Sequence, residues 1–147
     1  MVGTLVLNVA TWGCAGVGVG WWFARRDWRT FPQPGFISRL RRWETRQLYE
    51  RVFLVRIWKD RLPEAGTWFG GLSKRRLPSV EDGGRVRFGI ESLRAERVHY
   101  TLLLVVPLVM TWSRGWWIIA NITFGVLVNV PCIVVARYNR VRLALLA

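Results

Sequence analysis

An uncharged apolar run near the start of the chain, residues 2–24, constrains the fold more than any other feature. Its 23 residues read VGTLVLNVATWGCAGVGVGWWFA. As a helix the run would be roughly 34 Å long, enough to cross a hydrocarbon core of about 30 Å. No Lys or Arg precedes it, as one would in a signal peptide, and Arg25 and Arg26 follow it directly. Because Trp21 and Trp22 at its end are typical of the headgroup layer, we expect a retained transmembrane helix.

A second apolar region, residues 98–136, is too long for one crossing and is interrupted by Ser113-Arg114-Gly115. These three residues are typical of a turn and carry the only charge in this region. We therefore predict a hairpin with one arm over residues 98–113 and a returning arm over residues 115–136. Pro107 and Pro131 each remove a backbone hydrogen bond and are candidate kinks.

The distribution of basic residues predicts the orientation in the membrane. Of the 22 Lys and Arg residues, 18 lie in the segment 25–97, three lie in the tail 137–147, and only Arg114 is left for the other side. Cytoplasmic loops are enriched in such residues, so we expect an amino terminus outside and a cytoplasmic carboxy terminus. The prediction is a single all-α membrane domain, residues 1–147, with about three transmembrane helices, located in the cell membrane.

The basic segment between the first two predicted spans divides into two parts. Residues 36–62 contain no Gly or Pro and show apolar residues at helical spacings, such as Leu48, Val52 and Val55. We expect one or two helices lying on the cytoplasmic membrane surface, where arginines contact anionic lipid. Residues 63–89 contain six glycines and two prolines and are expected to form a loop or lid, and residues 67–89 have no assignable role. A helix resumes near Ile90 and continues into the membrane.

Several classes of function are excluded by what the sequence lacks. The net charge of +13 alone would be compatible with nucleic-acid binding, but the long apolar runs argue against a soluble basic domain. The two cysteines, Cys14 and Cys132, lie singly in apolar segments and are expected to serve packing. No cluster of His, Cys and carboxylates and no phosphate-binding glycine loop is present, so no metal and no bound cofactor are predicted.

One stretch carries chemistry, RAERVHY at residues 94–100, because it contains the single histidine at the boundary of the basic segment. Glu96 and His99 are three residues apart and would share one face of a helix. A carboxylate that accepts an imidazole N–H fixes the tautomer and leaves the other nitrogen as a general base. An ordinary ion pair on a helix surface explains the same spacing, and the sequence alone leaves both readings open.

Three stretches resemble the glycosyl-4,4′-diaponeurosporenoate acyltransferase family: VRIWKDRLPEAG at 55–66, RAERVHY at 94–100 and NVPCIVVARYNRVRL at 129–143. They occur in the same order around an apolar hairpin, and the resemblance covers about residues 48–143. It implies O-acyl transfer at the cytoplasmic leaflet, from a donor such as an acyl-coenzyme A thioester to a sugar hydroxyl of a glycosylated carotenoid or similar glycolipid. The catalytic residues implied are His99 and Glu96.

Further candidates would bind the substrates or the oxyanion of such a reaction. Asn129 or Lys59 could donate to the oxyanion, although Asn129 could equally form a hydrogen bond between helices. Trp58 and Lys59 could contact the donor or anchor the chain at the interface, and Arg94 could pair with Glu91 or with a phosphate. A polar wall of the same site is expected from Arg137, Tyr138, Asn139 and Arg140, and donor phosphates or membrane attraction from Lys74, Arg75 and Arg76.

The contrasting hypothesis is a small membrane subunit without catalytic activity, which binds lipid or acts as a scaffold in a larger complex. Its tryptophans, glycines and positive face suit that role as well. The expected partners are membrane lipids, the acceptor and the acyl donor, and no nucleic acid. A homo-oligomer is compatible with the size of the chain, because three helices hardly enclose a long lipid.

Overall fold

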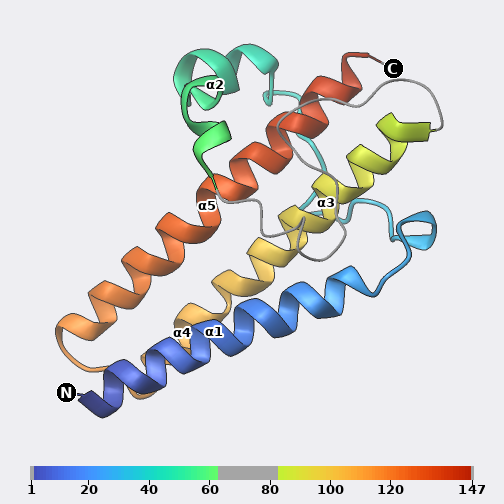
Figure 1. The fold of residues 1–147 in the computed structure, drawn as a ribbon. Coiled ribbons are helices and arrows are strands. Elements are labelled where there is room, and N and C mark those ends of the chain that lie inside the picture. The colour runs from blue at the N-terminus through green and yellow to red at the C-terminus, as the bar shows by residue number, and fades with distance from the viewer. Residues whose placement is uncertain (1, 63–82, 147) are drawn as a thin grey trace.

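The computed structural model describes residues 2–62 and 83–146, and the regular structure in these ranges is entirely helical. Three long helices form the body: α1 (Val2–Ala24), α3 (Gly84–Leu103) and α5 (Trp116–Ala144). A short helix, α4 (Val105–Met110), follows α3 (Figure 1). The remaining helical turns are η1 (Trp28–Thr30), η2 (Leu48–Val52), α2 (Val55–Trp58) and η3 (Lys59–Arg61).

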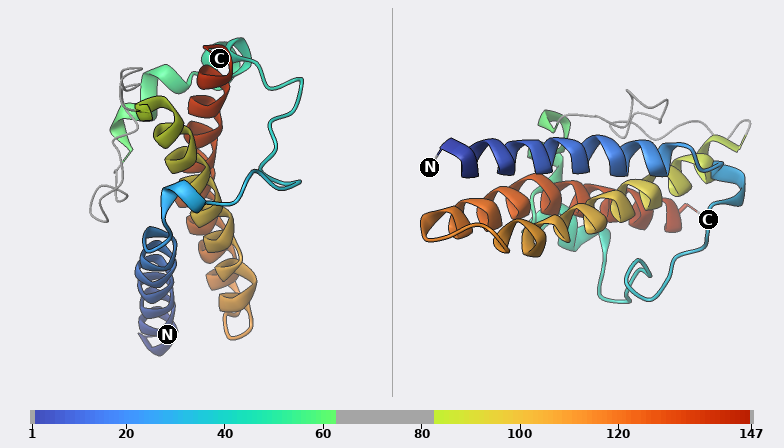
Figure 2. Two further views of the ribbon diagram at one scale, coloured as in Figure 1. Left: turned by 90° about the vertical axis from the view of Figure 1, so that its right-hand side faces the viewer. Right: turned by 90° about the horizontal axis from the view of Figure 1, so that it is seen from below.

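The long helices lie side by side in an elongated bundle. The α3–α4 arm and α5 run antiparallel, and α1 lies along the same bundle (Figures 1 and 2). The amino terminus therefore lies beside the turn between α4 and α5, while the end of α1, the start of α3 and the end of α5 share the opposite end. Arg25 directly follows α1, Arg85 and Arg87 lie in the first turn of α3, and Arg140 and Arg142 lie near the end of α5, so much of the basic charge is gathered at one end of the bundle.

The predicted hairpin is present, and its first arm is broken. Helix α3 ends at Leu103, one residue before α4 begins. Pro107 explains this break, because a proline has no N–H to bond to the carbonyl four residues earlier and its ring clashes with that carbonyl. Gly115 forms the turn with φ of +57°, a backbone conformation that residues other than glycine rarely adopt. The turn thus lies where the sequence predicted it.

Helix α5 continues well beyond the predicted end of the last span at residue 136. It runs to Ala144 with Pro131 inside it and is roughly 43 Å long at about 1.5 Å per residue. Within the described residues, α1 and α5 are the two helices long and apolar enough to cross a membrane. Arg137 and Arg140 consequently lie on the final turns of this helix rather than in an irregular tail.

The expectation of long interfacial helices over residues 36–62 is wrong for the first third of that segment. Residues 32–45 follow an irregular path, and the helical turns that come after it are short. Leu54 has a left-handed backbone with φ of +51°, which separates η2 from α2. Phe36 and Trp43 are 78% and 67% exposed instead of sharing a packed face. The contacts that hold this path are tertiary: as shown below, the backbone carbonyls of residues 37–39 accept hydrogen bonds from arginines of α5.

Asparagine and tryptophan side chains join α1 to the hairpin. Trp12 Nε1 donates to Asn121 Oδ1 at 3.0 Å, and Trp112 Nε1 donates to Asn8 Oδ1 at 2.9 Å. Asn121 in turn donates to Ser113 Oγ at 3.1 Å. Because buried polar groups are costly unless paired, these bonds fix the position of α1 along the hairpin.

Gly125 is where three helices meet most closely. A Cβ at this position would lie 2.5 Å from Val106 Cγ2 and 3.1 Å from the Trp12 ring. We expect Gly125→Ala to overpack the junction of α1, α4 and α5 and to cost about 1–3 kcal/mol. Thermal unfolding in detergent measures this cost, and Gly16→Ala, at a position with open space, serves as the matched control. Adding Val106→Ala should recover most of the loss, and an undisturbed Gly125→Ala protein would contradict the packing.

Candidate active site

The centre of the candidate site is the carboxylate of Glu96, which is completely buried between α3 and α5. Its Oε1 accepts a hydrogen bond from Arg137 Nη1, and its Oε2 accepts one from Arg140 Nη1. Both arginines also form ion pairs with it. A buried carboxylate is strongly destabilising without such partners, so Glu96 requires both helices to be in place.

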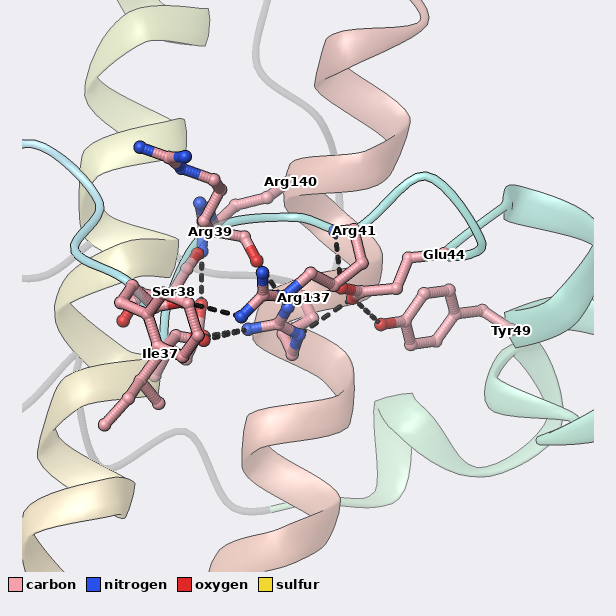
Figure 3. A network of polar contacts seen from close by, with 10 residues as sticks. Ile37, Ser38, Arg39, Arg41, Glu44, Tyr49, Arg137 and Arg140 are labelled. Atoms are coloured by element: carbon pink, nitrogen blue, oxygen red, sulfur yellow. Dashed lines mark hydrogen bonds and ion pairs between the residues drawn. The ribbon is translucent and has the colours of Figure 1, made fainter.

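Arg137 uses all five of its N–H donors. One binds Glu96, two bind Glu44 at 2.8 Å and 2.5 Å, and two bind the carbonyl oxygens of Ile37 and Arg39 at 3.3 Å and 3.0 Å (Figure 3). Arg140 adds a bond to the Ser38 carbonyl at 2.7 Å. The chain from residue 37 to residue 44 is therefore attached to α5 through arginines.

Glu44 completes this arrangement from the irregular segment. Tyr49 donates to its Oε2 at 2.6 Å, and the Arg41 backbone N–H donates to its Oε1 at 2.8 Å. Burial opposes ionisation of Glu44, but the bonds from Arg137, Tyr49 and Arg41 outweigh it and lower the pKa of the carboxyl. Burial and the bond to Glu44 raise the pKa of the Tyr49 phenol. Arg137 and Arg140 thus form ion pairs with the carboxylates of Glu44 and Glu96.

A second contact joins η2 to α5 through Tyr138, a neighbour of Arg137. Tyr138 donates to Glu50 Oε1 at 2.7 Å, and Arg46 donates to the same oxygen at 2.8 Å. These bonds lower the pKa of Glu50. Beside them lies an apolar cluster whose members are Tyr49, Val55, Val135, Tyr138 and Val141, with Trp58 packed against it.

His99 lies on α3 facing α5, further from the basic end of the bundle than Glu96. Its Nδ1 is 2.9 Å from Asn129 Oδ1, and Asn129 Nδ2 donates to the Gly125 carbonyl at 2.9 Å. Asn129 is 1% exposed. Asn129 lies eight residues from Arg137 on α5, roughly 12 Å along the helix axis. The imidazole is thus held by an amide, further into the bundle than the arginine cluster.

The Glu96–His99 pair stays a prediction, and the geometry gives both residues further partners. Asn129, from another helix, stands at His99 Nδ1, while the two oxygens of Glu96 accept from arginines. The predicted polar wall is divided as well. Arg137 and Arg140, three residues apart, share a face toward Glu96, whereas Tyr138 points to Glu50. Asn139 is fully buried in α5.

The remaining candidates, Arg94, Trp58 and Lys59, each have contacts of their own. Arg94 pairs with Glu91 at 2.8 Å, one of its two predicted partners, and donates to the Arg26 carbonyl. Trp58 donates to the Phe53 carbonyl at 2.9 Å, and Lys59 forms an ion pair with Asp60 at 2.5 Å. The oxyanion roles of Asn129 and Lys59 stay predictions. Lys74, Arg75 and Arg76, with most of the loop 67–89, lie outside the described residues.

Sequence reasoning missed Glu44, Tyr49, Glu50 and Ser38. The only available signal was that Glu44 and Glu50 are acidic residues within a basic segment, and so must each find a basic partner among many. The structure assigns the basic partners, Arg137 to Glu44 and Arg46 to Glu50, and adds Tyr138 as a second donor to Glu50. Among the described residues, no three His, Cys, Asp or Glu side chains are grouped as a metal site would require.

Comparison with known proteins places this arrangement in a family. The profile described as glycosyl-4,4′-diaponeurosporenoate acyltransferase matches residues 20–147, which include the whole arginine–carboxylate cluster and the His99–Asn129 pair. The chain belongs to this acyltransferase family. The predicted membership is confirmed, and the match extends further toward the amino terminus than the three motifs did.

Individual relatives in the acyltransferase family are moderately similar. A glycosyl-4,4′-diaponeurosporenoate acyltransferase of Staphylococcus haemolyticus is 36% identical over 107 residues, covering 69% of this chain and 60% of the relative. The protein of the same name from Staphylococcus aureus strain N315 is 32% identical over 98 residues, covering 66% and 59%. The matches therefore span about 60% of the length of these relatives. No solved structure matches the chain significantly.

The cluster predicts a large effect of one substitution in this acyltransferase family member. Arg137→Gln removes the charge that compensates buried Glu44 and Glu96, and we expect a loss of about 3–5 kcal/mol. Arg137→Lys should recover little, because an ammonium group cannot reproduce five directed bonds. Thermal unfolding in detergent measures both. Arg51→Gln, at an exposed arginine, is the control and should change stability by less than about 0.5 kcal/mol. Equal unfolding of Arg137→Gln and Arg51→Gln would contradict the cluster's role.

The lowered pKa values predict an acid-sensitive fold. The ordinary pKa of a glutamate carboxyl is 4.5, and the pKa values of Glu44 and Glu50 are lower than this in the folded protein. The unfolded chain therefore takes up protons first, so stability is full above about pH 4.5 and is lost as the pH falls through the folded values. Unfolding followed between about pH 6 and pH 3 should show this slope. Glu44→Gln should be less stable at neutral pH but flatter with pH, and an unchanged slope would contradict the assignment.

Proposed function

We propose that this protein is a membrane O-acyltransferase that esterifies a fatty acyl group onto a sugar hydroxyl of a glycosylated carotenoid or similar glycolipid. Membership in the acyltransferase family supports the class of reaction. The observation that carries the proposal within this chain is the His99–Asn129 contact at 2.9 Å. It supplies a base whose protonation can be deduced from its surroundings.

The hydrogen bonds of Asn129 determine which imidazole nitrogen is basic. The Gly125 carbonyl can only accept, so it must face the NH₂ group of Asn129, and the amide oxygen then faces His99. An oxygen at that position requires Nδ1 to carry the proton. In the neutral ring Nε2 is then the unprotonated nitrogen, which is the one able to remove a proton from a hydroxyl.

The reaction that follows is balanced in protons and bonds. As the sugar oxygen attacks the carbonyl carbon of the activated acyl donor, Nε2 of His99 takes the hydroxyl proton. The tetrahedral intermediate collapses by breaking the bond to the leaving group, which for a thioester departs as a thiolate and takes the proton from the imidazolium. The products are the ester and the free thiol. The donor is a co-substrate, such as acyl-coenzyme A, so the protein needs no bound cofactor.

Glu96, Arg137 and Arg140 have a different task in this proposal. Their charges are already matched within the cluster, since two carboxylates face two arginines. They therefore hold α3 against α5 at the level just before His99 rather than supplying spare charge to a substrate. The cluster keeps the base and Asn129 in register.

We propose three membrane crossings, α1, the α3–α4 arm and α5, with the basic end of the bundle in the cytoplasm. The collection of arginines at one end, with the single Arg114 at the opposite turn, supports this orientation. Exposed apolar residues along α1 and α5, such as Val9, Val17, Ile119 and Leu127, suit contact with lipid chains. The acceptor would enter from the membrane, and a second copy could complete its enclosure.

The decisive prediction concerns His99. In cells that make a glycosylated carotenoid and receive labelled fatty acid, mass spectrometry of membrane lipids should detect an acylated glycoside with the natural protein. We expect His99→Ala to reduce it by about 10²–10⁴-fold through loss of the base. Asn129→Leu should also reduce it, because the tautomer is no longer fixed.

Quantity and stability of the protein provide the control. His99→Ala should insert and unfold like the natural protein, which separates a lost reaction from a lost fold. A scaffold without catalytic activity predicts that acylation does not depend on His99. If label never enters a glycolipid with the natural protein, the acyltransferase proposal is wrong for this chain.

A further inference from the structure

A groove lies at the basic end of the bundle, separate from the contacts of His99. Its volume is about 590 Å³, within the range of about 300–1,000 Å³ typical of sites for small ligands. It lies between the first half of α3, the last turn of α5 and the irregular segment near residues 33–40. The lining is mostly aliphatic and includes Val86, Ile90, Leu93 and Leu143.

The outer wall of this groove is held in place by hydrogen bonds. Arg97 donates to the Gln33 carbonyl at 2.6 Å, and Arg140 donates to the Ser38 carbonyl at 2.7 Å. Gln33 and Arg140 themselves line the groove. A wall fixed by charged donors at two points is preorganised, so a ligand does not have to order it on binding.

The charges around the groove call for an anion. Arg140 is matched by Glu96, and Arg94 by Glu91. Arg85 also lines the groove, and its Nε, like those of Arg87 and Arg94 nearby on α3, is buried without a hydrogen-bond partner in the part of the chain that the structure describes. None of the described residues lining the groove is acidic. Since Arg85 lines the groove and no described carboxylate lines it beside this guanidinium, the charge there favours a ligand that brings negative oxygens to Arg85.

We propose that this groove binds the carrier arm of the acyl donor, a thiol carrier that ends in phosphate groups, and this inference rests on the proposed acyltransferase function. The phosphates lie at Arg85, where α3 begins. The thin arm follows the aliphatic lining toward Leu93. Arg85 and His99 are 14 residues apart on α3, roughly 21 Å, which is comparable to an extended phosphopantetheine arm. The described lining on α3 ends at Leu93, six residues before His99, so the thioester end of the arm points along α3 toward the level of the base.

Coenzyme A itself, without an acyl chain, is the probe, because it does not partition into lipid. Its binding is measured with the full chain in nanodiscs of zwitterionic lipid. We expect Arg85→Gln to weaken binding by about ten- to hundredfold, as the loss of a charged hydrogen bond does. Pantetheine, which lacks the phosphates, should bind weakly and be insensitive to this change.

Two bulky substitutions test the location. Val86→Trp fills the groove from a residue that is 64% exposed, and Ile57→Trp places the same ring on α2 at an equally exposed position outside the groove. Coenzyme A binding should be lost in the first and retained in the second, with both proteins unfolding alike. Equal binding by Val86→Trp and Ile57→Trp overturns the proposed site, as does an Arg85→Gln effect no larger than that of Arg51→Gln.

Two further outcomes separate this inference from others. Binding of coenzyme A to the natural protein is compared in nanodiscs that contain anionic phospholipid and in a lipid-free sample. If coenzyme A binds without lipid but not in the anionic nanodiscs, the groove is a lipid site and the donor assignment is wrong. His99→Ala should bind coenzyme A normally. Groove binding without any acyl transfer overturns the reaction alone, whereas undiminished transfer by Val86→Trp overturns the groove alone.

Discussion

The burial of Glu96 is the constraint on which the rest of the molecule depends. A fully buried carboxylate needs opposite charge, and α5 supplies it through Arg137 and Arg140. Arg137 then has donors left over, and these bind Glu44 and the carbonyls of Ile37 and Arg39. One charge requirement on α3 thus determines how α5 packs and how the irregular segment crosses both helices. The same segment forms one wall of the groove.

Features that follow from composition were predictable from the sequence. The first apolar helix, the turn at Ser113–Gly115 and the helix through residues 94–100 depend on local signals that no distant contact overrides. The helices expected over residues 36–62 depended on periodicity alone, and arginine–carbonyl bonds from α5 replaced them over the first third. Glu44 was not predictable as a partner of Arg137, because 93 residues separate them and many arginines lie closer in sequence.

The partner of His99 shows where spacing rules reach their limit. An i,i+3 spacing makes the Glu96–His99 contact possible, but it does not decide between competing donors. Two guanidinium groups provide full, permanent charge to Glu96, and a buried carboxylate gains more from them than from an imidazole that can lose its proton. Asn129, a strong candidate in the sequence for other reasons, instead reaches Nδ1 from the antiparallel helix.

The contact with Asn129 affects the chemistry expected of the base. A carboxylate at Nδ1 stabilises the protonated ring, whereas the amide of Asn129 orients the ring without adding negative charge. The neutral imidazole is the form able to accept a proton from a hydroxyl. Because Glu96 and Glu44 also neutralise the nearby arginines, the surroundings of His99 provide orientation more than charge. The negative charge of an activated donor must then be bound elsewhere, and Arg85 is the one of three described arginines with an unpaired buried Nε, beside Arg87 and Arg94, that lines the groove.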